Sequence, residues 1–330
     1  MTTMTEAPLA PSTGALTLRL TDRERYELGL LADELARVGT GRVDDLKWLD
    51  QARELSCRIP LRLLEIIRRY RHDCGPAALL MISNLPVDES GLPDTPTVRE
   101  SVERRATIPA AVSAMLSLQL GEVIAFKDEK TGALVQNVVP VPGLEQSQSN
   151  AGSVDLQMHV ENAFHPNRPD FVGLLCLRND HTRTAGTLVS SIRQALPLVS
   201  DEARRVLGQP RFVTQPPPSF QAGDSAPAHA VLDGDPADPN VRVDFAATVA
   251  IDEEARQALE RLRDAVALAA SVLVLQSGDL AFIDNRMALH GRSSFVPRYD
   301  GNDRWLHRTF VHLDNRRSRV DRPGDGAVLN

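Results

Sequence analysis

The chain has 330 residues, of which 42% are hydrophobic, and a formal net charge of −7. The apolar fraction is enough for a large core. The acidic balance and the absence of a basic block argue against nucleic acid as a partner, and no run reaches the ~18 apolar residues of a membrane span. Three cysteines without a CxxC pair, Cys57, Cys74 and Cys176, argue against a disulfide framework and fit a cytoplasmic protein.

The N-terminal third of the chain is expected to be helical. Residues 1–15 lack the basic and apolar segments of a signal peptide and are predicted to be a disordered tail. Thr21-Asp-Arg-Glu24 is a capping box that begins a helix ending near Val38. Three more helices are predicted, at about 45–56, from Pro60 past Ile67, and at about 97–118. We expect them to be scaffold.

From Glu122 onward the pattern indicates strands. Two apolar runs, 123–126 and 134–139, flank a turn at 128–132 and predict a β-hairpin. Other strands are predicted at about 154–161, 171–177, 279–284 and 305–312, and a helix at about 252–271. Many strands without a GxGxxG or P-loop motif favour a barrel or jelly roll over a doubly wound sheet.

The domain organisation follows from these elements. Residues 16–320 are expected to form one domain that is mostly β with flanking helices, and residues 321–330 are expected to fray. Residues 209–240 are rich in Ala, Asp and Pro and include Pro216-Pro-Pro218. Because a long loop inside a compact domain is usually a lid or a disordered insertion, we predict a lid insertion there.

The stretch from Gln157 to His165 carries a candidate metal motif. In a strand, side chains i and i+2 point to the same face, so His159 and Glu161 can bind one ion from one side. His290 offers a second imidazole far along the chain. Two imidazoles and one carboxylate form the facial triad of non-haem Fe(II) enzymes, which leaves positions open for reactants. A zinc hydrolase is the alternative, although the helical HExxH motif is absent.

Arg304 strengthens the iron interpretation. An oxygenase that uses 2-oxoglutarate needs a buried cation for the distal carboxylate, and arginine binds carboxylates bidentately. Arg304 precedes Trp305 and Leu306 in a run that enters the core. The alternative for Arg304 is an ion pair at the surface.

Several segments together resemble one family. The chain resembles the clavaminate-synthase-like Fe(II)/2-oxoglutarate oxygenases, and within them the bacterial members that hydroxylate free L-asparagine. The resemblance extends from about Glu122 to Arg319. It rests on segments 134–143, 150–153, 161–165, 168–170, 175–178, 216–220, 284–286, 290–292 and 297–301.

The resemblance implies a double-stranded β-helix, or jelly roll, and a role for each of nine residues. The iron ligands would be His159, Glu161 and His290. The residues for 2-oxoglutarate would be Arg304 and, beside it, Thr187. The residues for the amino acid would be Arg308 at the α-carboxylate, Glu129 at the α-ammonium, and Asn150 and Asp244 at the side chain.

The implied reaction consumes Fe(II)-bound 2-oxoglutarate and O₂ and releases succinate and CO₂. The expected product is 3-hydroxyasparagine for nonribosomal peptide antibiotic biosynthesis. Val160 stands where a polar residue is expected in an asparagine enzyme, so another free amino acid, such as arginine or lysine, stays an alternative. A jelly-roll binding protein without activity is the alternative from another class, and Asp244 could instead pair with Arg242 at the surface. The sequence predicts no oligomeric state.

Overall fold

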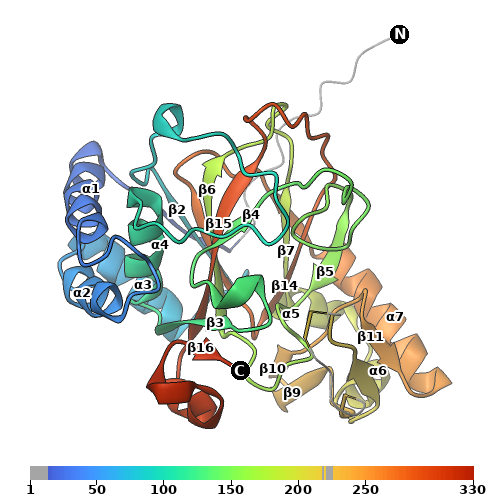
Figure 1. Ribbon diagram of the computed structural model, residues 1–330. Coiled ribbons are helices and arrows are strands. Elements are labelled where there is room, and N and C mark those ends of the chain that lie inside the picture. Colours follow the sequence, from blue (N-terminus) through green and yellow to red (C-terminus); the bar gives the residue numbers. More distant parts are fainter. Residues whose placement is uncertain (1–13, 218, 221–225) are drawn as a thin grey trace.

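The computed structural model describes residues 14–217, 219–220 and 226–330. Its centre consists of two β-sheets (Figure 1). Residues from both sheets line one cavity between them. Residues 1–13 of the predicted tail, and residues 218 and 221–225 of the predicted lid, lie outside the described residues. Within the described part of the chain, no helix combines the length and apolar character needed to cross a bilayer.

The major sheet has eight strands. Its central pair, β6 (Phe171–Arg178) and β15 (Trp305–His312), is antiparallel and buried at every position. This burial on both faces explains the nearly continuous apolar run of β6. The order of the main path is β1 (Leu16–Arg19), β2 (Leu79–Ser83), β13 (Leu280–Asp284), β6, β15, β3 (Glu122–Phe126) and β16 (Val328–Leu329), and β4 (Gln136–Val138) also pairs with β15.

The minor sheet has four strands in the order β12 (Ser271–Leu273), β7 (Thr187–Ser191), β14 (Ala288–Arg292) and β5 (Leu156–His159). Strand β14 lies between β7 and β5, with His290 opposite His159 and Arg292 opposite Thr187. Two small antiparallel sheets complete the strands: β8 (Phe212–Thr214) with β11 (Thr248–Ala250), and β9 (Leu232–Asp235) with β10 (Asp238–Val241).

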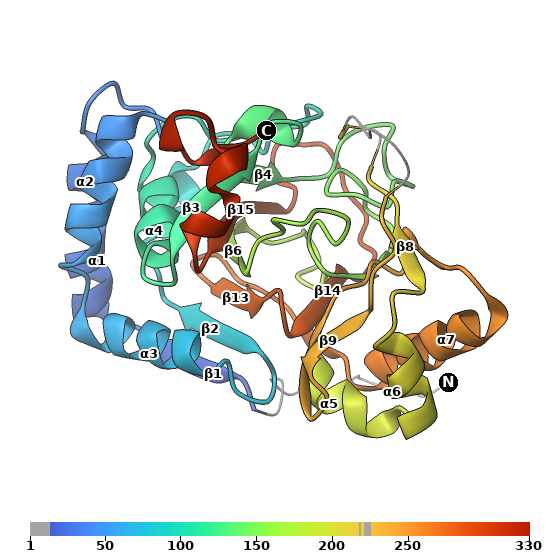
Figure 2. The ribbon, with the colours of Figure 1, turned by 90° about the horizontal axis from the view of Figure 1, so that it is seen from below.

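The helices form two groups on opposite sides of the sheets (Figures 1 and 2). The first group is α1 (Asp22–Ala36), α2 (Leu46–Ser56), α3 (Leu61–His72) and α4 (Ile108–Ser117), and α4 packs on β15 and β6. The second is α5 (Ile192–Ala195), α6 (Asp201–Leu207) and α7 (Glu253–Leu268), and α7 packs on β7 and β11. The capping box at Thr21 is confirmed, as is the fold class: a mostly β jelly roll with flanking helices.

The predicted hairpin at 123–139 is wrong. Strands β3 and β4 do not pair with each other; both pair with the same edge of β15, one after the other. The turn between them includes the short 3₁₀ helix η2 (Lys130–Gly132), in which three consecutive residues have positive φ, 49°, 54° and 70°. The chain therefore leaves β15 and returns to it, and the excursion carries Glu129.

Three other predictions need correction. Helix α4 begins only at Ile108, because Thr107 caps it and Pro109 suits a helix start but not its interior. The segment 209–240 is not a plain loop, since it holds β8, β9 and part of β10. Residues 321–330 do not fray: β16 pairs in parallel with β3, and Leu329 is fully buried. Short 3₁₀ helices lie at Glu89–Gly91, Leu196–Leu198, Asn315–Asp321 and Pro323–Asp325.

Candidate active site

Two adjoining pockets contain all nine of the predicted site residues. The inner pocket lies between the two sheets and is lined by Thr187, His290, Arg292, Arg304 and Arg308, among others. The outer pocket is lined by Glu129, Asp244 and residues of the 215–220 segment. His159, Glu161 and Asn150 line both pockets, so the three border the passage between them.

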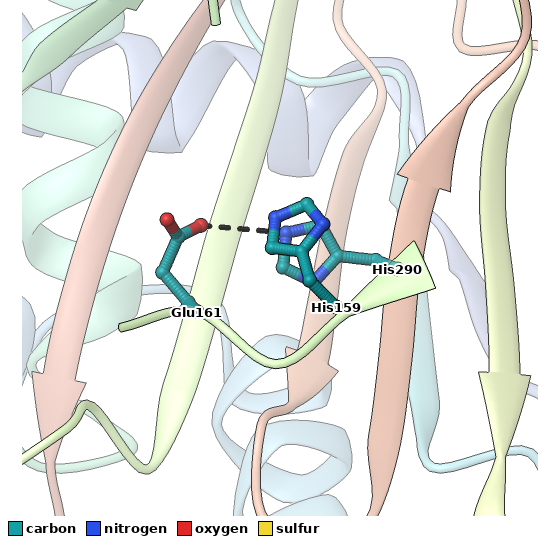
Figure 3. A group of neighbouring side chains, drawn as sticks. All are labelled: His159, Glu161 and His290. Atoms are coloured by element: carbon teal, nitrogen blue, oxygen red, sulfur yellow. Dashed lines mark ion pairs between the residues drawn. The ribbon is translucent and has the colours of Figure 1, made fainter. Parts of the chain in front are cut away.

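The three predicted iron ligands converge on one point (Figure 3). His159 ends β5 and His290 lies opposite it on β14, so their rings are 4.4 Å apart between centroids. The Glu161 carboxylate faces both rings, with Oε2 3.3 Å from His290 Nε2. One ligand atom from each residue lies within 4.8 Å of the others. The geometry therefore offers one facial set of two nitrogens and one oxygen.

The protonation states of these groups fit a metal. Burial would raise the pKa of Glu161, but the nearby Arg308 guanidinium holds that pKa well below its usual range. Burial, with His159 nearby, lowers the pKa of His290. An ionised carboxylate and neutral imidazoles are the forms that bind a divalent metal. Among the described residues, no hydrogen-bond donor satisfies the buried Glu161 Oε2, which leaves it free to be a ligand.

His159 is oriented by its own strand. Its Nδ1 lies 2.8 Å from the carbonyl oxygen of Gln157. Because a carbonyl only accepts, Nδ1 carries the proton and Nε2 keeps its lone pair for a metal.

The inner end of the pocket is cationic. Arg304 is 4% exposed and donates from Nη2 to Thr187 Oγ1 at 3.1 Å, so the two residues lie side by side, as the family resemblance implied. Arg292, which sequence reasoning missed, is as deeply buried and donates to the carbonyl oxygens of Ser149 and Val154. The Phe295 ring lies 5.7 Å from the Arg292 guanidinium and 6.0 Å from that of Arg304.

Neither of these two arginines pairs with a carboxylate within the described part of the chain. Burial lowers the pKa of both guanidinium groups, that of Arg292 to about 10. Two buried cations without an acidic partner favour an anion in the space beside them. The His290-Gly-Arg292 segment was the available signal for Arg292, because it places the arginine on the same strand face as the ligand.

Arg308 connects the inner pocket to the outer one. Its guanidinium donates to Glu161 Oε1 at 2.8 Å, to Glu129 Oε1, and to Oε1 of Gln136. With its amide turned to suit its neighbours, Asn150 accepts from both Nη groups of Arg308 at 3.0 Å. Gln136, on β4 opposite Arg308, was not predicted. Sequence reasoning missed it because β4 was expected to pair with β3.

Glu129 and Asp244 reach the outer pocket from loops. Asn162 Nδ2 donates to Glu129 Oε2 at 3.0 Å, and burial raises the pKa of Glu129. Asp244 lies beside His159, because Val243 accepts from the backbone of Val160 and Phe245 donates to that of Met158. The Asp244 carboxylate accepts from Ala246 N at 2.8 Å.

The surface pairing considered for Asp244 is wrong. Arg242 donates to the carbonyl oxygens of Ala163 and Phe164, at 2.6 and 3.0 Å, and makes no ion pair with Asp244. Asp244 is thus left to face the outer pocket.

Comparisons with known proteins show the family of this chain. Residues 122–310 match the model of the taurine catabolism dioxygenase TauD, TfdA family. The chain is 49% identical to an L-asparagine oxygenase from Streptomyces coelicolor, over 95% of this chain and 94% of the relative.

Two solved structures are similar as well. An asparagine oxygenase in complex with Fe(II), 2S,3S-3-hydroxyasparagine and succinate has a TM-score of 0.92 at 48% identity, covering 95% of this chain and 98% of the other. The non-heme iron oxygenase OrfP in complex with Fe and alpha-ketoglutaric acid has a TM-score of 0.88 at 31% identity, covering 96% and 100%.

Proposed function

Because the chain belongs to the TauD/TfdA dioxygenase family, we propose that it is an Fe(II)- and 2-oxoglutarate-dependent hydroxylase of free L-asparagine. The observation that carries the proposal is the arrangement of the pockets. A facial triad stands between an inner pocket that holds Arg292 and Arg304, neither paired with a carboxylate, and an outer pocket whose lining includes Glu129, Asp244 and Asn150. The expected product is 3-hydroxyasparagine for nonribosomal peptide antibiotic biosynthesis, with succinate and CO₂ released.

The residues divide the work between metal, cosubstrate and substrate. His159, Glu161 and His290 would hold the metal from one side, and Fe(II), when bound, supplies the activation of O₂. Arg304 and Thr187 would hold the distal carboxylate of 2-oxoglutarate. Arg308 would take the substrate α-carboxylate and Glu129 the α-ammonium. Since Arg308 already contacts Glu129 and Glu161, the amino acid would enter an existing network of charges.

Asparagine fits the remaining donors and acceptors. An ionised Asp244 only accepts, so it suits the NH₂ end of the substrate amide. Asn150, with its amide oxygen on Arg308, keeps its own NH₂ group as a donor for the substrate carbonyl oxygen. Free aspartate would bring a second carboxylate against Asp244 and should be rejected.

We also propose that part of the 209–240 segment covers the outer pocket as a lid. Gln215, Pro216, Pro217, Ser219 and Phe220 line that pocket. Phe220 packs edge-on against Phe164 with ring centroids 4.7 Å apart. A cover of this kind keeps bulk water from the reacting groups.

We infer a cytoplasmic location from the cysteines. Cys57, Cys74 and Cys176 are all free. Burial raises the pKa of Cys74 and of Cys176 to about 12, so both are inert thiols that need no oxidising compartment.

A panel of free amino acids tests the proposal. Purified protein with Fe(II), 2-oxoglutarate and O₂ should add one oxygen atom to asparagine, detected by mass, and release succinate in equal amount. A product from arginine or lysine but not asparagine would overturn the substrate and keep the family. Absence of succinate with every amino acid would favour a binding protein without activity, and turnover without O₂ would favour a hydrolase.

A further inference from the structure

Glu161 follows the end of strand β5 and therefore has no neighbouring strand to pair with in that sheet. Strand β5 stops at His159, and its pairing with β14 ends at the His159–His290 pair. On the other side, Val160 N still bonds to Val243 O. At Glu161 the side chain of Asn285 makes the backbone hydrogen bonds that a neighbouring strand would otherwise make. The Glu161 backbone N–H donates to Asn285 Oδ1 at 2.8 Å, and its backbone carbonyl accepts from Asn285 Nδ2 at 3.1 Å.

Further contacts hold Asn285 in the core. Its side chain is fully buried, and Nδ2 also donates to the carbonyl oxygen of Pro169 at 2.8 Å. Its own backbone N–H donates to Asp170 O at 2.9 Å. The amide oxygen faces a donor and the amide nitrogen faces two acceptors, so only one orientation of the amide satisfies all three bonds.

The position of Asn285 in the chain connects two iron ligands. It lies in the turn between β13 and β14, and β14 carries His290. One turn therefore fixes the backbone of Glu161 and begins the strand that presents His290. Arg308 pulls on the same carboxylate, because its Nη1 donates to Glu161 Oε1 at 2.8 Å. Without a fixed backbone, this ion pair would draw Glu161 away from the imidazoles.

We propose that Asn285 is a positioning residue that acts through Glu161: it replaces the missing strand partner and thereby holds the third ligand of the iron triad in place. The inference rests on the proposed function, since it takes Glu161 as an iron ligand. Groups that orient a ligand, without touching the metal, typically contribute 10- to 100-fold to metal affinity.

The test is a titration of metal-free protein with Mn(II), a redox-inert substitute for Fe(II), in which free Mn(II) is measured by electron paramagnetic resonance. Asn285→Ala should bind Mn(II) roughly 10- to 100-fold more weakly than wild type. If Asn285→Ala does not fold, Asn285→Ser keeps a polar group in the buried site and is titrated in its place. Its affinity should also fall, because serine is too short to reach both Glu161 backbone groups.

Asn137→Ala is the matched control. Asn137 is also buried, accepts from Trp305 Nε1 at 2.8 Å and donates to Ser101 Oγ at 2.9 Å, but its side chain bonds to no iron ligand. The Asn137→Ala protein should lose thermal stability but keep its Mn(II) affinity within about twofold, because Asn137 and the triad share no hydrogen-bond partner.

The outcomes separate this inference from the proposed function. A folded Asn285→Ala that binds Mn(II) as tightly as wild type would overturn the positioning role, even if its melting temperature falls. Wild-type protein that binds Mn(II) no better than His290→Ala would overturn the proposed metal site itself.

Discussion

The inner and outer pockets are built from different parts of the fold. Most residues of the inner pocket lie on paired strands: Thr187 on β7, His290 on β14 and Arg308 on β15. The two acids of the outer pocket that are proposed to bind the substrate come from connections: Glu129 from the excursion between β3 and β4, and Asp244 from the segment between β10 and β11. Two of the three proposed iron ligands, His159 and His290, are thus fixed by sheet pairing, whereas the acids proposed to select the substrate lie in loops.

The difference also appears in how each pocket is held. His290 is fixed by hydrogen-bonded neighbours on both sides, β5 and β7. Glu129 depends on single side-chain contacts to Arg308 and Asn162, and Asp244 on a local turn. Loss of a triad residue should therefore stop the reaction, while a change at Asp244 should redirect it.

The largest effect is expected at the triad. His290→Ala, or His159→Ala, should abolish metal binding and turnover while the protein stays folded, because the sheets keep their backbone pairing. Metal analysis, succinate release and circular dichroism measure the three quantities. Normal turnover by either variant would remove this site from consideration.

Arg304→Ala should be next in size. Loss of one buried, charge-assisted partner costs roughly 3–5 kcal/mol, so the requirement for 2-oxoglutarate should rise at least about 100-fold. The KM for asparagine should change little, because Arg304 does not line the outer pocket. Steady-state kinetics with each substrate varied in turn separates the two. A change confined to the KM for asparagine would instead assign Arg304 to the amino acid.

Asp244→Asn should redirect the enzyme. The substitution removes the repulsion of a substrate carboxylate, which amounts to several kcal/mol at short range in a dry pocket, and adds a donor. The ratio of kcat/KM for asparagine to that for aspartate should fall by about 100-fold or more. Competition between the two amino acids, followed by mass detection of the products, measures this ratio. An unchanged preference would show that Asp244 does not select the side chain.

The smallest effect is expected at Arg292, at the cationic end of the inner pocket. The guanidinium groups of Arg292 and Arg304 both lie near the Phe295 ring. Arg292 also donates to the backbone carbonyl of Ser149, the residue before Asn150. Arg292→Gln should weaken 2-oxoglutarate binding by roughly fivefold, about 1 kcal/mol for a charge that acts at a distance. Calorimetric titration with 2-oxoglutarate measures it.

Arg298→Gln is the control for Arg292→Gln, because Arg298 carries the same charge, lies shortly after Arg292 in the chain and is exposed. Equal affinities for 2-oxoglutarate in the two variants would confine Arg292 to a structural role.

Local patterns in the sequence determined much of this protein. The capping box at Thr21 predicted the start of α1, and a nearly continuous apolar run predicted β6. Spacing of two along an extended chain predicted that His159 and Glu161 share a face. The chemistry of iron and carboxylate binding added His290 and Arg304. Family resemblance supplied the remaining candidates, and the structure brings all of them to the two pockets. These features depend on residues close together in the chain or on recognisable motifs, and the sequence alone is enough to predict them.

Tertiary structure alone decided which strands pair and which side chains replace a strand. Strand β4 joined β15 and not β3, which brought Gln136 to Arg308. The C-terminal strand β16 pairs in parallel with β3. Asn285 became the backbone partner of Glu161, although 124 residues separate them. Each outcome depends on hydrogen-bond partners distant in the chain, and local propensity carries no information about which distant partner will be near.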